Sequence, residues 1–342
     1  VLALQRLSGP QDDWPEALQW LVLLLPLAWA GLALWVLLWR VAGTRLARLA
    51  VVGLTPVPLL LHGWLAPPLF WWSEPPPDPD AYAGLPLSEH ILDTQARLIR
   101  DALAAVQPPQ PGRVNVYALT YAPYAAENVF MRESAVVART LGERFGAGGR
   151  TVDLVANPAT VTTLPWATPR NLHRAIAHAA AVMDRERDLL FLHLTSHGGA
   201  DGRLAADTSP LHSEPMTPGL LKRWLDEAGV RWRVISVSAC YSGSWIEPLA
   251  GDGTLVMTAA DADHTSYGCG RRSELTFFGR AMYEEELRKT WSFTEAHAAA
   301  RRLIEVRERQ AGKSDGYSNP QIREGAGVRA VLQRLALERG SP

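Results

Sequence analysis

The chain has 342 residues, 47% of them hydrophobic, and its 34 basic and 35 acidic residues give a formal net charge of −1. This length accommodates one sizeable domain with additional elements. Near-neutral charge, with no Lys/Arg stripe interleaved with aromatic residues, excludes an electrostatic argument for nucleic-acid binding. Two cysteines are too few for a disulfide scaffold or a cysteine-based zinc site, so we predict no cofactor and no metal.

The first 73 residues differ in kind from the rest. Two uncharged runs, at about residues 17–39 and 49–72, are each longer than the roughly 20 residues that a hydrocarbon core requires. Eight of the 13 tryptophans lie within the first 72 residues, and several flank these runs as interfacial anchors do. We predict two transmembrane segments. The alternatives are a signal peptide, for which the first run is too long, and a helical hairpin buried in a water-soluble protein.

Charge predicts the orientation of this hairpin. The connector between the two runs carries Arg40, Arg45 and Arg48 and no acidic residue, whereas both outer flanks are acidic. An excess of arginine places the connector in the cytoplasm, so the chain that follows faces outward. A proline-rich linker at residues 74–86 then leads to a domain at residues 87–342.

Helical and strand patterns alternate through this larger domain. Alternation of this kind predicts an α/β fold, a three-layer sandwich with helices on both faces of a mainly parallel sheet. Several helices have an N-cap residue, and two have Pro at the first helical position. The predicted helices are 88–106, 127–145, 168–187, 217–229, 274–289 and 293–310, and the predicted strands are 114–120, 151–156, 188–194, 233–238 and 254–260.

Polar blocks follow two of these strands directly, TSHGG at residues 195–199 and SACYSGS at residues 238–244. In a parallel sheet the working crevice lies beyond the carboxyl ends of the strands. One helix lies between the two strands, which predicts a right-handed crossover and neighbouring strands. His197 and Cys240 are therefore expected at the same edge, with sulfur and imidazole within hydrogen-bonding range. A base beside a thiol is the minimum for a cysteine nucleophile, although each residue alone has a structural interpretation.

These two blocks, with TAADADHTSYGC at residues 258–269, resemble the legumain (asparaginyl endopeptidase) family of caspase-like cysteine peptidases. The resemblance runs from about Val114 to Gly327 and is closer to a bacterial branch with a membrane segment ahead of the peptidase domain. It implies a caspase-like fold in a bacterial inner-membrane protein whose peptidase domain faces the periplasm. It also implies Cys240 as nucleophile, His197 as base, and the N–H groups of Gly198 and Cys240 as oxyanion donors.

The resemblance places the substrate pocket around the loop that follows the strand at 254–260. Thr265 and Ser266 match a pair of adjacent hydroxyls in the family, and Asp263 lies on the same rim. Family members carry an acidic residue two positions before the nucleophile, where this chain has Ser238. A pocket without that acceptor reads a substrate carboxamide differently, which puts strict Asn preference in doubt.

Four further residues have assignments from the resemblance or from their position. Arg132 matches a substrate-binding basic residue, with a surface salt bridge as the alternative, and Asn128 matches the Asn that orients the histidine in some family members. His193, inside a predicted strand, is interpreted as a core histidine with satisfied hydrogen bonds. Cys269 shares a sheet edge with Cys240, and we hypothesise that a bridge between them switches the enzyme off.

The expected function is a membrane-anchored cysteine endopeptidase that cuts protein or peptide substrates after Asn or Asp. Two alternatives stay open. One is a transamidase or ligase, in which an amine resolves the same acyl-enzyme. The other is a non-catalytic, caspase-like interaction module anchored in the membrane.

Overall fold

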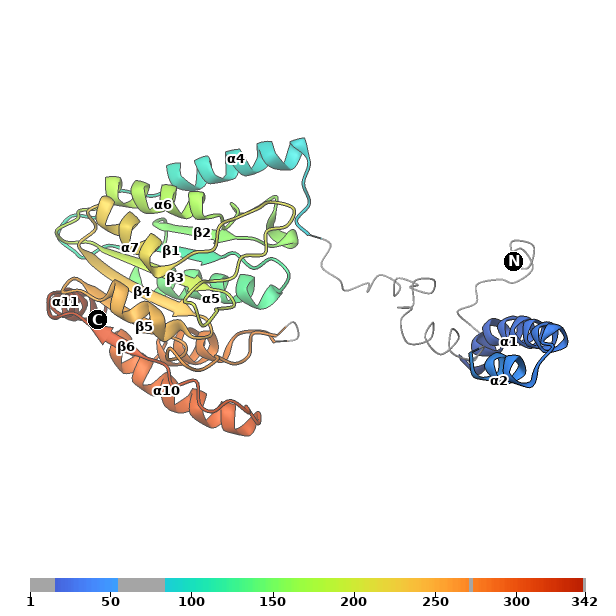
Figure 1. Ribbon diagram of the computed structural model, residues 1–342. Helices are drawn as coiled ribbons and strands as arrows, with labels where there is room; N and C mark the ends of the chain where they lie inside the picture. Colours follow the sequence, from blue (N-terminus) through green and yellow to red (C-terminus); the bar gives the residue numbers. More distant parts are fainter. Residues whose placement is uncertain (1–15, 55–83, 271–272, 341–342) are drawn as a thin grey trace. The chain divides into compact units, whose positions relative to one another are not determined.

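The computed structural model describes residues 16–54, 84–270 and 273–340 (Figure 1). The chain divides into two compact units, residues 1–81 and 82–342. In the first unit, α1 (Glu16–Val41) and α2 (Arg45–Leu54) are helices.

The membrane prediction is not supported by this first unit. Within the ranges that the structure describes, no helix has the length and apolar character needed to cross a bilayer. The second predicted segment, at about 49–72, and the predicted linker at 74–86 lie mostly outside the described residues.

A mainly parallel sheet organises the second unit, as the sequence predicts. Its strand order is β2-β1-β3-β4-β5-β6. Every adjacent pair is parallel except β5 and β6, which are antiparallel. The strands are β1 (Val116–Ala122), β2 (Thr151–Val155), β3 (Leu189–Thr195), β4 (Trp232–Ser238), β5 (Thr254–Thr258) and β6 (Ile322–Glu324).

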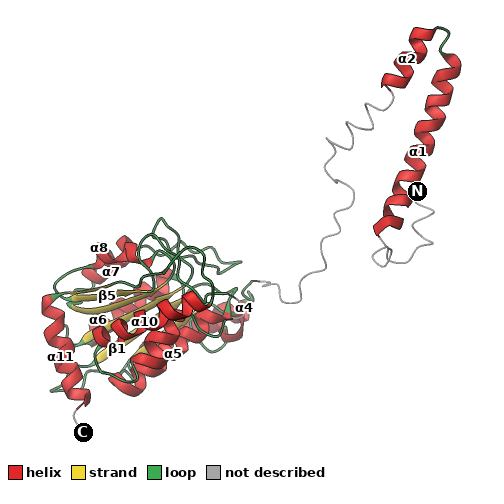
Figure 2. Cartoon of the chain, turned by 90° about the horizontal axis from the view of Figure 1, so that it is seen from below, coloured by secondary structure: helices red, strands yellow, loops and turns green. Residues whose placement is uncertain are grey.

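Helices cover both faces of this sheet, so the α/β prediction is confirmed (Figure 1). One face carries α4 (Glu89–Ala104), α6 (Pro169–Val182), α7 (Pro218–Glu227) and α8 (Ile246–Leu249). The other carries α5 (Asn128–Phe145), α9 (Phe277–Gly279) with the π-helical stretch η4 (Arg280–Glu286), α10 (Phe293–Gln310) and α11 (Ala326–Gly340). Figure 2 shows α5 and α10 lying over the strands.

The central strands are apolar because both of their faces are covered. All seven residues of β1 and all seven of β3 are buried. Along β1, Tyr117 and Leu119 belong to the core under α4 and α6, whereas Val116 and Ala118 belong to the core under α5. Alternation along the strand therefore divides its side chains between two cores, as expected when helices pack on both faces.

Three features differ from the predicted elements. The helix predicted to extend to 187 ends at Val182, because Met183 has an extended backbone (ψ 156°) and Asp188 accepts a hydrogen bond from the Asp184 N–H at 2.9 Å. The helix predicted at 274–289 is α9 followed by η4. The short edge strand β6 and the helix α11 were not predicted.

A buried polar network lies under the carboxyl end of β4. His193 is fully buried, and its Nδ1 is 3.1 Å from Ser236 Oγ and its Nε2 3.1 Å from Glu133 Oε1. Glu133 also accepts a hydrogen bond from Thr276 Oγ1 at 2.5 Å. The same Thr276 Oγ1 lies 3.3 Å from Ser238 Oγ. His193 is therefore a satisfied core histidine, which confirms that interpretation.

The carboxylate of this network is stabilised in its charged form. Burial alone would raise the pKa of Glu133, but the hydrogen bond and the charge of His193, with the hydroxyls of Thr276 and Ser238, outweigh burial and lower that pKa. The carboxyl end of β4, which leads to Cys240, therefore packs over a buried carboxylate that is paired with His193.

We expect Glu133→Ala to lower the free energy of unfolding by about 3–5 kcal/mol, because it leaves His193 buried without its acceptor. Glu143→Ala is the control on the same helix; its side chain is 55% exposed, so we expect a loss below about 1 kcal/mol. Urea unfolding of the full chain at neutral pH measures both. Equal losses would contradict the role of the network.

Because the pKa of Glu133 is lowered, its contribution to stability is complete above the ordinary carboxyl range and disappears as pH falls through the folded-state pKa. The difference between parent and Glu133→Ala should therefore shrink in acid.

Candidate active site

The register of β3 on β4 positions the two predicted catalytic residues. Thr195 lies opposite Ser238 in this parallel pair. His197 and Cys240 each follow two residues later, so both emerge at the carboxyl edge of the sheet. Directly after Cys240, Tyr241 takes a left-handed backbone conformation (φ 54°), and its N–H donates to His264 O at 2.9 Å. Cys240 therefore lies on a sharp turn that leads into the 3-10 turn η3 (Ser242–Trp245) and α8.

Gly198 allows the two loops to meet. A Cβ at this position would lie 2.1 Å from Cys240 O, so only glycine fits without displacing backbone. Gly198 forms a short antiparallel bridge with Leu204. Its two neighbours make the hydrogen bonds of this bridge: the Ala205 N–H donates to His197 O and the Gly199 N–H donates to Arg203 O, both at 2.9 Å. The Gly198 N–H is not used in that bridge. The oxyanion role of the Gly198 and Cys240 N–H groups stays a prediction.

The Cys240 thiol has polar neighbours that favour its ionised form. Its Sγ lies 3.6 Å from Ser266 Oγ and 3.7 Å from Ser266 O. A hydrogen bond from Cys269 contributes most to lowering the pKa of Cys240 to about 6; burial opposes this, and Ser266 and the charge of His197 add to it. These surroundings favour the thiolate, the reactive form of the sulfur.

Cys269 is the complementary partner. Its hydrogen bond to Cys240, its burial and the nearby negative charges of Cys240 and Glu127 raise the pKa of the Cys269 thiol. The interaction that lowers the pKa of Cys240 therefore raises the pKa of Cys269, which favours Cys269 as the hydrogen-bond donor of the pair. Both cysteines are free.

The His197 ring is held by a segment between β1 and α5. Its Nε2 is 3.1 Å from Glu127 Oε2, and the rings of Tyr124 and Phe130 meet it edge-on at centroid distances of 4.7 and 5.1 Å. Within the described residues the hydrogen bonds of the Cys240 sulfur go to Ser266 and Cys269, and His197 acts on it through charge. The pair shares one edge of the sheet as predicted, but the predicted hydrogen bond between sulfur and imidazole is not formed among the described residues, because the His197 ring bonds Glu127 instead.

Of the predicted substrate-binding residues, Ser266 lies closest to the chemistry. It is 8% exposed and contacts the Cys240 sulfur. Ser238 is 2% exposed and faces Thr276 within the buried network.

The other three predicted residues lie on the surrounding loops. Thr265 Oγ1 donates to Asp315 Oδ2 at 2.5 Å. Asp263 is exposed and its N–H donates to Asp261 Oδ1 at 3.0 Å. Arg132 donates to the carbonyl oxygens of residues 273 and 274 at 2.6 and 2.9 Å, so it holds a loop that borders the site. Their part in substrate binding stays a prediction.

Sequence reasoning missed Glu127. The resemblance matches the orienting role to Asn128, but the Asn128 side chain accepts from Asn157 Nδ2 at 2.8 Å, and the carboxylate of the neighbouring Glu127 contacts His197. The signal was present, since β1 pairs with β3 and an acidic residue shortly after β1 emerges beside the residues that follow β3.

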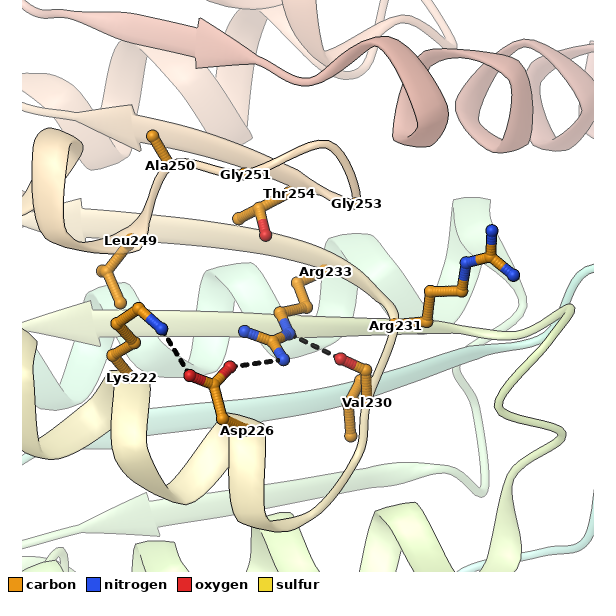
Figure 3. Close-up of a pocket in the computed structure, with 10 residues that line it drawn as sticks. All are labelled: Lys222, Asp226, Val230, Arg231, Arg233, Leu249, Ala250, Gly251, Gly253 and Thr254. Carbon is orange, nitrogen blue, oxygen red and sulfur yellow. Dashed lines mark hydrogen bonds and ion pairs between the residues drawn. The ribbon is translucent and has the colours of Figure 1, made fainter.

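A separate pocket of about 230 Å³ lies at the opposite end of the strands (Figure 3). Asp226 joins Lys222 and Arg233 there, and Arg233 Nε also donates to Val230 O at 2.6 Å. Arg233 lies at the start of β4, next to its first residue Trp232, and Cys240 follows the end of that strand, so this pocket is not part of the candidate active site. In the described part of the chain no cluster of three or more His, Cys, Asp or Glu residues could hold a metal ion.

A family model agrees with the predicted resemblance. The model of the Peptidase C13 family matches residues 168–323, a segment that contains His197 and Cys240. No curated protein matches the chain. Among solved structures, caspase-1 from Spodoptera frugiperda and its pro form are each 14% identical, with a TM-score of 0.45, covering 64% of this chain and 93% of theirs.

We expect Cys269→Ala to raise the pKa of Cys240 above about 6, because the thiolate loses its strongest hydrogen-bond donor. The rate of iodoacetamide alkylation, followed by mass spectrometry of the Cys240 peptide from pH 4 to 9, measures this pKa. The midpoint should move to higher pH, and Ser266→Ala should move it less. An unchanged midpoint in Cys269→Ala would exclude this coupling.

Proposed function

We propose, because the model of the Peptidase C13 family matches residues 168–323, that this chain is a cysteine endopeptidase in which Cys240 is the nucleophile and His197 the acid and base. The observation that carries the proposal is the register of β3 on β4, which brings Cys240 and His197 to one sheet edge, where the surroundings also lower the pKa of the Cys240 thiol. A structural cysteine buried in apolar surroundings would have a raised pKa.

The reaction follows from these groups. The Cys240 thiolate attacks the scissile carbonyl carbon, and the carbonyl electron pair becomes an oxyanion, for which the Gly198 and Cys240 N–H groups are the proposed donors. The C–N bond then breaks, and the leaving amine takes a proton from the His197 imidazolium. Water attacks the thioester after giving its proton back to His197, which releases the acid and regenerates the thiolate.

We further propose cleavage after Asn or Asp. The polar rim of Ser266, Thr265 and Asp263 offers hydroxyls and a carboxylate for a small polar side chain close to the nucleophile. Ser238 is turned into the buried network and is not an exposed acceptor. Recognition of the substrate side chain therefore depends on the loop after β5.

We expect digestion of a peptide library by the full chain to give cuts after Asn and Asp. Cys240→Ala should abolish them, and His197→Ala should lower kcat/KM by at least about 10³-fold, because both residues act in one proton-transfer unit. Cys269→Ala, which also removes one thiol, should retain measurable cleavage.

The same digest separates the alternatives. Product masses that include an added amine would identify a transamidase. Equal cleavage by the parent and Cys240→Ala, or none by either, would contradict the proposed peptidase.

Attachment to a bacterial inner membrane, with the peptidase unit in the periplasm, stays a prediction from the sequence. Apolar side chains on α1 are exposed in the first unit, with Leu25 at 62%, Trp29 at 73% and Leu32 at 59%. An apolar surface of this kind requires a cover, which we propose is lipid.

We expect the full chain, expressed in a bacterium, to remain in the membrane fraction after carbonate washing. Protease added to spheroplasts should digest the second unit. Recovery in the supernatant, or protection from that protease, would contradict this placement.

A further inference from the structure

The side chain of Glu127 does not cap α5, the helix that begins after it. It occupies the N-cap position of α5 with an extended backbone (φ −133°, ψ 122°), yet its side chain makes no capping hydrogen bond. The shorter side chains of Ser, Thr, Asp and Asn ordinarily accept a hydrogen bond from the first turn at this position, and Glu is not among these preferred residues. Here the carboxylate, 15% exposed, instead contacts His197 Nε2 at 3.1 Å.

This contact determines which nitrogen of His197 carries a proton. An ionised carboxylate only accepts hydrogen bonds, so the nitrogen that faces it must be the donor. In the neutral imidazole, Nε2 is therefore protonated and Nδ1 holds the lone pair. Tyr124 and Phe130 flank the ring edge-on at interplanar angles of 87° and 83°, which restricts its rotation.

The charge of the same carboxylate also acts on Cys269, the neighbour of the proposed nucleophile. Glu127 contributes to the raised pKa of Cys269, after the hydrogen bond and charge of Cys240 and burial. It therefore helps to keep Cys269 protonated as the donor to the Cys240 thiolate. When His197 holds a proton, Glu127 also stabilises the imidazolium.

We propose that Glu127 is the positioning residue of the site, which directs His197 Nδ1 to the reacting groups and stabilises the protonated ring. This inference rests on the proposed function, since it gives Nδ1 the proton-transfer role. In the first half of the reaction Nδ1–H gives its proton to the leaving amine as the C–N bond breaks. In the second half Nδ1 takes a proton from the water that attacks the thioester.

Two variants separate position from charge. Glu127→Ala removes the acceptor, so His197 should populate both neutral tautomers and kcat/KM should fall about 10- to 100-fold. Glu127→Gln keeps an acceptor oxygen but removes the charge. The alkaline limb of its pH–kcat/KM profile should move to lower pH, because a neutral amide stabilises the imidazolium less. Neither change removes a capping bond of α5.

Nuclear magnetic resonance gives a readout that does not require activity. The full chain, labelled with ¹⁵N-histidine, contains nine histidines, and loss of a signal in His197→Gln identifies the His197 resonances. At alkaline pH the parent should show a protonated Nε2 and an unprotonated Nδ1. Glu127→Ala should show averaged nitrogen shifts. Glu143→Gln, an exposed acid on α5, is the matched control and should leave the signals and the pH profile unchanged.

The outcomes distinguish this inference from the proposed function. If the parent cleaves peptides but Glu127→Ala keeps both the tautomer and the pH profile, the positioning role is wrong and the peptidase stands. If no peptide is cleaved but the tautomer depends on Glu127, the proposed function fails and the positioning role stands. The pH dependence is then measured through alkylation of Cys240, whose alkaline behaviour should still differ between parent and Glu127→Gln.

Discussion

The site depends on the parallel pairing of β3 with β4 in the register that places Thr195 opposite Ser238. A slip of one residue would turn His197 or Cys240 to the other face of the sheet, because side chains alternate along a strand. Gly198 then allows the loop after β3 to approach the Cys240 carbonyl more closely than any side chain permits. The pairing of β3 with β4 thus brings together His197 and Cys240, which are 43 positions apart in sequence.

Beneath this pairing, a polar chain runs between the strands and α5. Tyr283 donates to Ser236 at 2.5 Å, Ser236 contacts His193, and His193 contacts Glu133. A one-residue shift of β4 would separate Ser236 from these partners and leave buried polar groups unsatisfied, which is costly. The apolar cores give the sheet its stability, and we infer that this network makes one register better than its neighbours. Two acidic residues therefore support the site. Glu133 acts through the buried network under β4, and Glu127 acts through its contact with His197.

Much of the fold and the centre of the site could be predicted from sequence, because they depend on local patterns. Apolar runs that end at Gly/Ser blocks predicted β3 and β4, and strand ends in a parallel sheet share an edge, which placed His197 with Cys240. Contacts between distant segments could not be read in this way. Glu127 meets His197, 70 positions away, and Cys269 meets Cys240 because a loop folds back. The three-residue β6 has no periodicity of its own and forms only because β5 offers an edge.

The central claim is that Cys240 is the nucleophile of the site. A peptide with Asn at its carboxyl end, carrying an acyloxymethyl ketone, forms a thioether only with a positioned thiolate. After incubation with the full chain at neutral pH, peptide mapping should find one adduct, on Cys240, that is absent in His197→Ala over the same time. An adduct on Cys269 instead, or equal labelling after the chain is unfolded in urea, would contradict the account.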